Sequence, residues 1–118
     1  GLGDVYKRQL QLVEQLELAI VAGEYRAGGK LPSVRELAAE AAVNPNTMQR
    51  AMQELEARGL INTQRTAGRT ITEDETMIQA LRQQKAQEQI AQFWAAMQKL
   101  GFTQAEALSL LKQTKENA

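Results

Sequence analysis

The feature that most constrains the fold is a very short connection between two predicted helices. Ser33, followed three residues later by Glu36, forms a capping box and opens a helix that can run to about Ala42. Asn44 is a good N-cap and Pro45 suits a first helical position, so the next helix begins there. Two helices joined by about three residues must cross sharply, which indicates a helix-turn-helix.

The second of these helices separates apolar from polar side chains. Its apolar positions recur at helical spacing and are Met48, Ala51, Met52 and Leu55. The side chains that point elsewhere near its start are amides, a hydroxyl and an arginine, namely Asn46, Thr47, Gln49 and Arg50. Such side chains can read base edges in a DNA major groove, but a solvated surface helix would show the same pattern. The neighbouring segments have to decide between the two interpretations.

A β-hairpin is predicted directly after this helix, which ends near Arg58 and Gly59. Two short runs with β-branched residues, 60–64 and 69–72, flank a turn that contains Gly68. Arg65 and Arg69 are expected at the tip. A hairpin in this position is the wing of a winged-helix domain, so the predicted fold is mainly α with a small β-hairpin.

The chain divides into three predicted segments. Residues 1–9 show no clear period and are expected to be poorly ordered or non-native. Residues 10–72 form the winged helix-turn-helix domain, which begins with an amphipathic helix that Gly23 ends. Residues 73–118 form a tail of two helices. This tail is predicted to be a dimerisation region.

The tail carries an apolar stripe on either side of a polar stretch, residues 82–89. A stripe that includes Phe93 and Trp94 indicates either packing against another surface or the wall of a ligand pocket. Two isolated helices bury too little surface to be stable alone, which favours pairing with a second copy. The predicted dimer interface comprises Met77, Leu81, Ile90, Phe93, Trp94, Met97, Leu100, Leu108 and Leu111.

Composition excludes several classes of site. The chain has no Cys and no His, so a disulfide framework, a zinc finger and a Ser-His-Asp triad are ruled out. No constellation of acids, nucleophile and base stands out, so we expect no catalytic residues, no metal, no cofactor and no enzymatic activity. Neither a signal peptide nor a long apolar stretch is evident, which predicts a soluble cytoplasmic protein without a membrane partner.

The overall charge is balanced, with 14 basic and 14 acidic residues, but the charges are not evenly spread. Residues 44–72 contain four Arg against two Glu, whereas residues 73–118 contain five basic and six acidic residues. An anionic partner is therefore expected to meet the middle of the chain.

Three blocks of sequence, and the order in which they occur, resemble the GntR family of transcriptional regulators. They are LPSVRELA at residues 31–38, VNPNT at 43–47 and LEARGLI at 55–61. The short tail resembles the YtrA subfamily, in which two helices replace a large effector domain. The resemblance covers residues 10–115. It implies a homodimeric winged-helix repressor that binds a palindromic operator in double-stranded DNA, often near transporter genes.

The resemblance also implies roles for particular residues. Arg35 would contact DNA backbone or bases, the segment 44–50 would enter the major groove, and Gly68 with its basic neighbours would reach the minor groove. The predicted DNA-binding residues are Ser33, Arg35, Asn44, Asn46, Thr47, Gln49, Arg50, Arg65, Thr66, Gly68 and Arg69. Whether a small-molecule effector exists is left open. The family's turn often has Gly where this chain has Ala42, which predicts a slightly strained turn.

Two other classes of function compete with this interpretation. A winged-helix domain can act as a protein–protein adaptor without specific DNA binding, but the arginines of the hairpin argue against that role. Some GntR relatives carry an aminotransferase-like domain, which needs far more chain than 118 residues.

Overall fold

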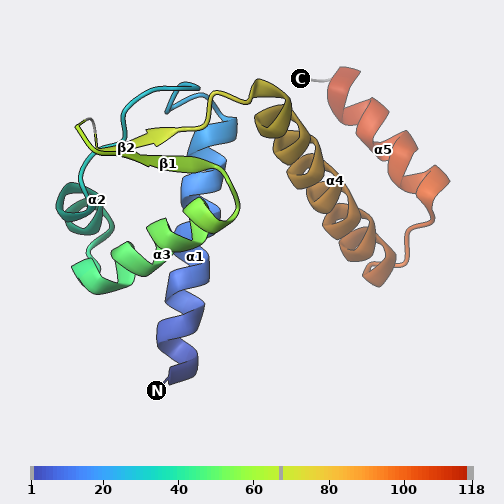
Figure 1. Ribbon diagram of the computed structural model, residues 1–118. Helices are drawn as coiled ribbons and strands as arrows, with labels where there is room; N and C mark the ends of the chain where they lie inside the picture. The colour runs from blue at the N-terminus through green and yellow to red at the C-terminus, as the bar shows by residue number, and fades with distance from the viewer. Residues whose placement is uncertain (1, 67, 117–118) are drawn as a thin grey trace. The chain divides into compact units, whose positions relative to one another are not determined.

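The computed structural model describes residues 2–66 and 68–116 and divides into two compact units, residues 1–82 and 83–118 (Figure 1). The first unit contains α1 (Leu2–Val21), α2 (Val34–Ala41), α3 (Pro45–Ala57), β1 (Ile61–Gln64) and β2 (Gly68–Ile71). Helix α4 (Glu75–Lys99) passes from the first unit into the second, which also holds α5 (Gln104–Glu116). In the part of the chain described, no helix is both long and apolar enough to cross a membrane.

Helix α3 lies at the centre of the first unit, because it packs on both α1 and α2. Its apolar face, predicted from spacing alone, is fully buried: Met48, Ala51, Met52 and Leu55 are each at most 2% exposed. Leu12 and Val13 of α1 are buried in the same core. With the β1–β2 hairpin following α3, the arrangement is a winged helix-turn-helix, and the predicted fold class is confirmed.

Helix α1 differs from the prediction at its start. Residues 1–9 were expected to be poorly ordered or non-native, whereas the structure has the helix begin at Leu2. Extending a helix from a turn that the core already holds requires no new nucleation, which explains why the exposed Val5 and Tyr6 are helical. Arg8 Nη2 also donates a hydrogen bond to the Ala41 carbonyl oxygen at 3.1 Å. This bond satisfies one of the free carbonyl groups at the end of α2.

The turn between α2 and α3 carries the strain that its sequence predicts. Ala42 adopts φ 56° and ψ 46°, the left-handed region that favours glycine. Its conformation lets the Val43 amide donate to the Ala38 carbonyl at 3.0 Å and ends α2. The direction in which α3 leaves the turn therefore depends on one strained residue.

Substitution of Ala42 by Gly should raise the free energy of unfolding by about 0.5–1 kcal/mol, because it removes a left-handed penalty of about 1–2 kcal/mol but makes the unfolded chain more flexible. The exposed Ala39 lies within α2, and Ala39→Gly should instead lower stability by about 0.5–1 kcal/mol. Urea denaturation of both variants measures the difference. Equal losses in the two variants would show that the Ala42 turn stores no strain.

The hairpin pairs antiparallel in the register Ile61–Ile71, Asn62–Thr70, Thr63–Arg69 and Gln64–Gly68. The loop before α2 adds a short third segment, since Lys30 forms a bridge with Thr70. The Leu31 amide donates to the Arg69 carbonyl at 2.9 Å, and the Ile71 amide donates to the Gly29 carbonyl at 2.8 Å. The loop before α2 and the hairpin are thus held together.

The boundary between the units lies at Arg82, ten residues later than the predicted boundary at Thr72. Ile78 is buried and Leu81 is half-buried, and both belong to the core of the first unit. Of the predicted interface residues, Leu81 therefore packs against its own chain. The cause is that α4 supplies its first turns to the first unit before it enters the polar stretch.

The second unit has little core of its own. Among its described residues, only Ala107 is buried. Helix α4 ends in a turn in which the Phe102 amide donates to the Met97 carbonyl at 3.1 Å, with Gly101 at φ 91°. Five large apolar side chains are between 42% and 72% exposed, namely Ile90, Leu100, Leu108, Leu110 and Leu111.

The start of α5 should lose stability in acid. The Thr103 amide donates to Glu106 Oε1 at 3.0 Å, and the Glu106 amide donates to Thr103 Oγ1 at 3.2 Å, which is a capping box. The backbone N–H of Thr103, and then its side chain, lower the pKa of Glu106. A lowered pKa contributes stability above the unfolded value of about 4.3, and this contribution is lost as the pH falls through the folded value.

Amide hydrogen exchange at the first turn of α5, followed from pH 6 to pH 3, should therefore show fraying in the acid range. Fraying should appear as a step in the exchange rate, once the rate is corrected for its intrinsic pH dependence. A Glu106→Gln variant should not show this step. A step of the same size in both proteins would assign the acid sensitivity to another group.

Candidate nucleic-acid interface

The start of α3 presents hydrogen-bonding side chains to solvent. Asn44 caps the helix, because its Oδ1 accepts a hydrogen bond from the Asn46 amide at 2.8 Å. Asn46 and Arg50 are exposed, whereas Thr47 and Gln49 are half-buried. The buried face of α3 fixes the helix, and these side chains are left free for a ligand. Their contact with DNA remains a prediction.

A groove lies beside the start of α2. It has a volume of about 810 Å³ and is lined by Tyr25, Lys30, Leu31, Pro32, Ser33, Val34, Arg35, Glu36, Gly68 and Arg69. This cationic groove brings together four residues that the sequence predicted as DNA-binding: Ser33, Arg35, Gly68 and Arg69. In Figure 1 the hairpin end, α2 and the start of α3 follow one another along the same edge of the first unit.

Lys30 is a basic residue of this groove that sequence reasoning missed. It is exposed, and its Cε lies 3.9 Å from the position that a Cβ on Gly68 would occupy. Its pairing with Thr70 places it next to the hairpin, although the two are distant in sequence. The available signal was a basic residue directly before the LPSVRELA block.

The charge of the cationic groove is mainly positive. Lys30, Arg35 and Arg69 line it against one carboxylate, Glu36, which accepts a hydrogen bond from the Ser33 hydroxyl at 3.2 Å. Burial, and then the negative charges of Glu40 and Glu24, raise the pKa of Tyr25. The Tyr25 hydroxyl therefore stays protonated at neutral pH. Cations with a hydroxyl donor suit a phosphate backbone.

Arg69 does not lie at the tip of the hairpin, as the sequence led us to expect. It lies on β2 opposite Thr63, is half-buried, and its Nε is 3.3 Å from Glu56 Oε1. The Thr63 hydroxyl donates to the same carboxylate oxygen. We call Glu56, Thr63 and Arg69 the Glu56 cluster. It ties the last turns of α3 to both strands of the hairpin.

Arg65 and Thr66 are exposed and lie in the turn of the hairpin, as predicted for Arg65. Arg58, at the end of α3, forms two ion pairs. Its Nη1 lies 3.1 Å from Glu17 Oε2 and its Nε lies 3.1 Å from Glu54 Oε1. Glu17 belongs to α1 and its side chain is 5% exposed, so Arg58, whose own side chain is 39% exposed, connects the end of α3 to α1.

Acidic side chains could in principle hold a metal ion even in a chain without His and Cys. Within residues 2–66 and 68–116, they do not gather into a group that could do so.

Comparison with known proteins agrees with this architecture. Residues 8–71 match the family described as "Bacterial regulatory proteins, gntR family". The chain is 38% identical over 103 residues to the "Uncharacterized HTH-type transcriptional regulator YhcF" of Bacillus subtilis, which covers 87% of this chain and 85% of that protein. It is 44% identical over 64 residues to the "HTH-type transcriptional repressor YtrA" of the same organism, over 54% of this chain and 49% of YtrA.

The fold is also similar to that of a solved structure, a "GntR family transcriptional regulator from Listeria monocytogenes". The TM-score is 0.80 at 40% sequence identity, and the match covers 89% of this chain and 92% of that one. The resemblance seen in the sequence blocks is thereby confirmed, for the family and for its YtrA-like members. The chain belongs to the GntR family and is a DNA-binding transcriptional regulator.

Proposed function

We propose that this regulator is a repressor that binds a palindromic operator as a homodimer, with one α3 for each half-site. The observation that carries the proposal is the placement of the exposed, amide- and Arg-bearing start of α3 on the same edge of the unit as the cationic groove. A recognition helix needs phosphate contacts beside it to fix its register on the duplex.

The proposed contacts fall into two groups. Side chains at the start of α3 read base edges in the major groove, and these are Asn44, Asn46, Thr47, Gln49 and Arg50. Residues of the cationic groove and the hairpin neutralise phosphates or reach the minor groove, and these are Lys30, Ser33, Arg35, Arg65, Thr66 and Gly68. Arg69 is proposed to act mainly through the Glu56 cluster.

The dimer is proposed to form through the second unit. With Ala107 as its only buried residue among those described, this unit exposes more apolar surface than a stable pair of helices would leave in water. A second copy that packs against Ile90, Leu100, Leu108 and Leu111 would bury this surface. The half-buried Phe93, Trp94 and Met97 lie on α4, the same helix as Ile90.

Selection of genomic fragments on the full chain, followed by footprinting, tests specific binding. We expect one enriched site with two-fold symmetry that overlaps a promoter, and we propose transporter genes as the first targets to inspect. Arg50→Ala should weaken binding to that site about fivefold or more, whereas Arg82→Ala, an exposed arginine in the polar stretch of α4, should not. A selection that enriches no site over bulk DNA would contradict the proposal.

Light scattering tests the dimer. A full chain with Leu108→Lys and Leu111→Lys should be monomeric, because two charges would have to be buried in an apolar interface. Leu18 is also an exposed leucine, 52% exposed on α1, and Leu18→Lys should leave the dimer intact. A dimer that survives the double substitution would place the interface elsewhere.

A further inference from the structure

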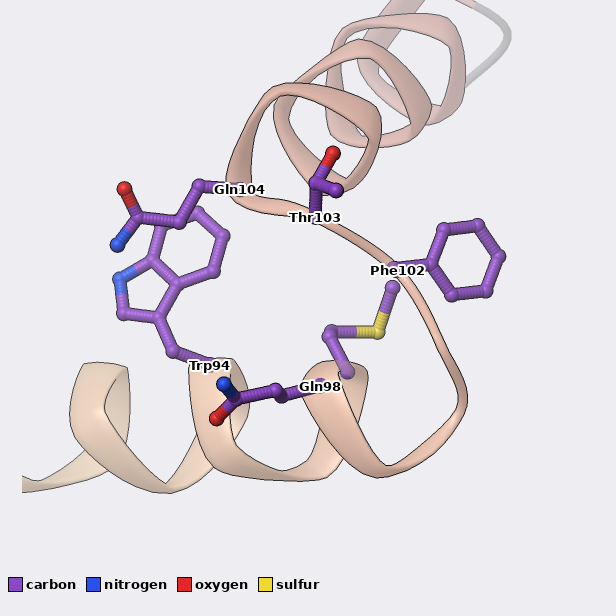
Figure 2. A pocket seen from close by; sticks show the side chains of 6 residues that line it. Trp94, Gln98, Phe102, Thr103 and Gln104 are labelled. Atoms are coloured by element: carbon purple, nitrogen blue, oxygen red, sulfur yellow. The ribbon is translucent and has the colours of Figure 1, made fainter.

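The second unit contains a small pocket at the corner between α4 and α5. It has a volume of about 260 Å³ and is lined by Trp94, Met97, Gln98, Phe102, Thr103 and Gln104 (Figure 2). All six residues belong to the second unit, so the pocket does not depend on how the two units are placed. The turn around Gly101 shapes it by bringing the start of α5 back towards the end of α4.

Two kinds of surface meet in this pocket. Trp94 supplies an indole face, and Gln98 and Gln104 supply carboxamides, each of which both donates and accepts hydrogen bonds. Figure 2 shows Trp94 and Gln98 projecting from α4, with Gln104 at the start of α5. An aromatic wall with amide groups at its edge is suited to a flat ring whose own edge carries donors and acceptors.

The pocket favours a neutral ligand over a charged one. None of its six lining residues is ionisable. The start of a helix can attract anions, but the Glu106 amide already donates to Thr103 Oγ1 and the Thr103 amide already donates to Glu106 Oε1. The Glu106 carboxylate next to the pocket would also repel an anion.

The volume fits a single substituted ring or two small fused rings. A closed apolar cavity of about 150 Å³ holds benzene, and pockets for drug-sized ligands begin at about 300 Å³. A volume of about 260 Å³ lies between these two values. A larger ligand, such as a dinucleotide, would not be enclosed.

We infer that this pocket is a binding site for a neutral, planar ring that carries a carboxamide-like edge. The ring stacks on Trp94, and its edge exchanges hydrogen bonds with Gln98 and Gln104. The site would give the regulator a ligand input on the unit that does not carry the recognition helix. The inference stands without the operator or the proposed dimer, because it rests on residues of the second unit alone.

The test uses the full chain and three single-ring probes. Trp94 is the only tryptophan, so its fluorescence and its indole N–H signal in NMR spectra report directly on the pocket. Benzamide should give saturable shifts of the Trp94, Gln98 and Gln104 side-chain signals. Benzoate, which has the same shape but a negative charge, and benzyl alcohol, which lacks the amide edge, should bind at least about fivefold more weakly.

Two exposed positions give matched variants. Gln98→Leu and Gln104→Leu should each weaken benzamide binding about fivefold, whereas Gln113→Leu, an exposed glutamine on α5 outside the pocket, should leave it unchanged. The inference is overturned if benzoate binds as tightly as benzamide, if both pocket variants bind like the unmodified chain, or if the Trp94 signals respond to protein dilution but not to benzamide.

Discussion

Replacement of both Lys30 and Arg35 by Ala is expected to weaken binding to duplex DNA by about ten- to a hundredfold near physiological salt. Both side chains are exposed and line the cationic groove. If each neutralises one phosphate, the slope of log affinity against log salt concentration should become shallower by about 1.8, since each contact contributes about 0.9. Fluorescence anisotropy of a labelled duplex at several salt concentrations measures affinity and slope together.

A charge-matched control separates groove contacts from a general change of charge. The double variant Arg82→Ala with Lys112→Ala also removes two positive charges, but from exposed positions outside the groove. It should leave the salt slope nearly unchanged. If this control and the groove variant lose affinity equally, a diffuse charge effect is responsible and the groove has no special role.

Arg69 lines the same groove but is expected to respond differently from Lys30 and Arg35. Because its guanidinium is bound by Glu56, Arg69→Met should lower affinity by disturbing the hairpin while changing the salt slope little. Glu56→Gln leaves Arg69 less strongly held. If Arg69 were mainly a phosphate contact, its release by Glu56→Gln would raise the affinity for DNA and steepen the slope of log affinity against log salt concentration.

The elements of the first unit could be predicted because their signals are local. The Ser33–Glu36 capping box and the Asn44 cap each involve residues within one helical turn, and the structure has α2 and α3 begin at Val34 and Pro45. The apolar period of α3 likewise depends on one helix. The left-handed Ala42 was expected from the family resemblance, because the family's turn often has Gly at this position.

The roles of several charged residues could not be predicted, because long-range contacts decide them. Arg69 meets a glutamate 13 residues away, and Arg58 meets one 41 residues away. Composition and spacing identify an arginine but not its partner. Lys30 was missed for the same reason, since only the pairing of its loop with β2 brings it to the groove.

The unit boundary shows a related limit of sequence patterns. Ile78 and Leu81 lie in the apolar stripe that precedes the polar stretch, but helical period does not say which surface will cover them. Both pack on the core of the first unit. The helical period does not identify the element against which a residue packs, so that information has to come from the structure.

Replacement of Arg58 by Met is expected to lower the free energy of unfolding by about 1–3 kcal/mol. The variant keeps an unbranched apolar stem but leaves the Glu17 carboxylate, 5% exposed, without this cation. Removing one partner of a fully buried ion pair costs about 3–5 kcal/mol. The smaller value is expected here because the Arg58 side chain is 39% exposed and water screens part of the interaction.

The second partner of Arg58 supplies the control for this prediction. Glu54 is itself 39% exposed, and an exposed pair four residues apart on a helix contributes about 0.3–0.5 kcal/mol, so Glu54→Gln should cost no more than that. Urea denaturation compares the two variants, and double substitution with Glu17→Gln should recover part of the Arg58→Met loss. If Arg58→Met costs no more than Glu54→Gln, the contact with Glu17 does not hold α3 against α1, and the recognition helix owes its position to apolar packing alone.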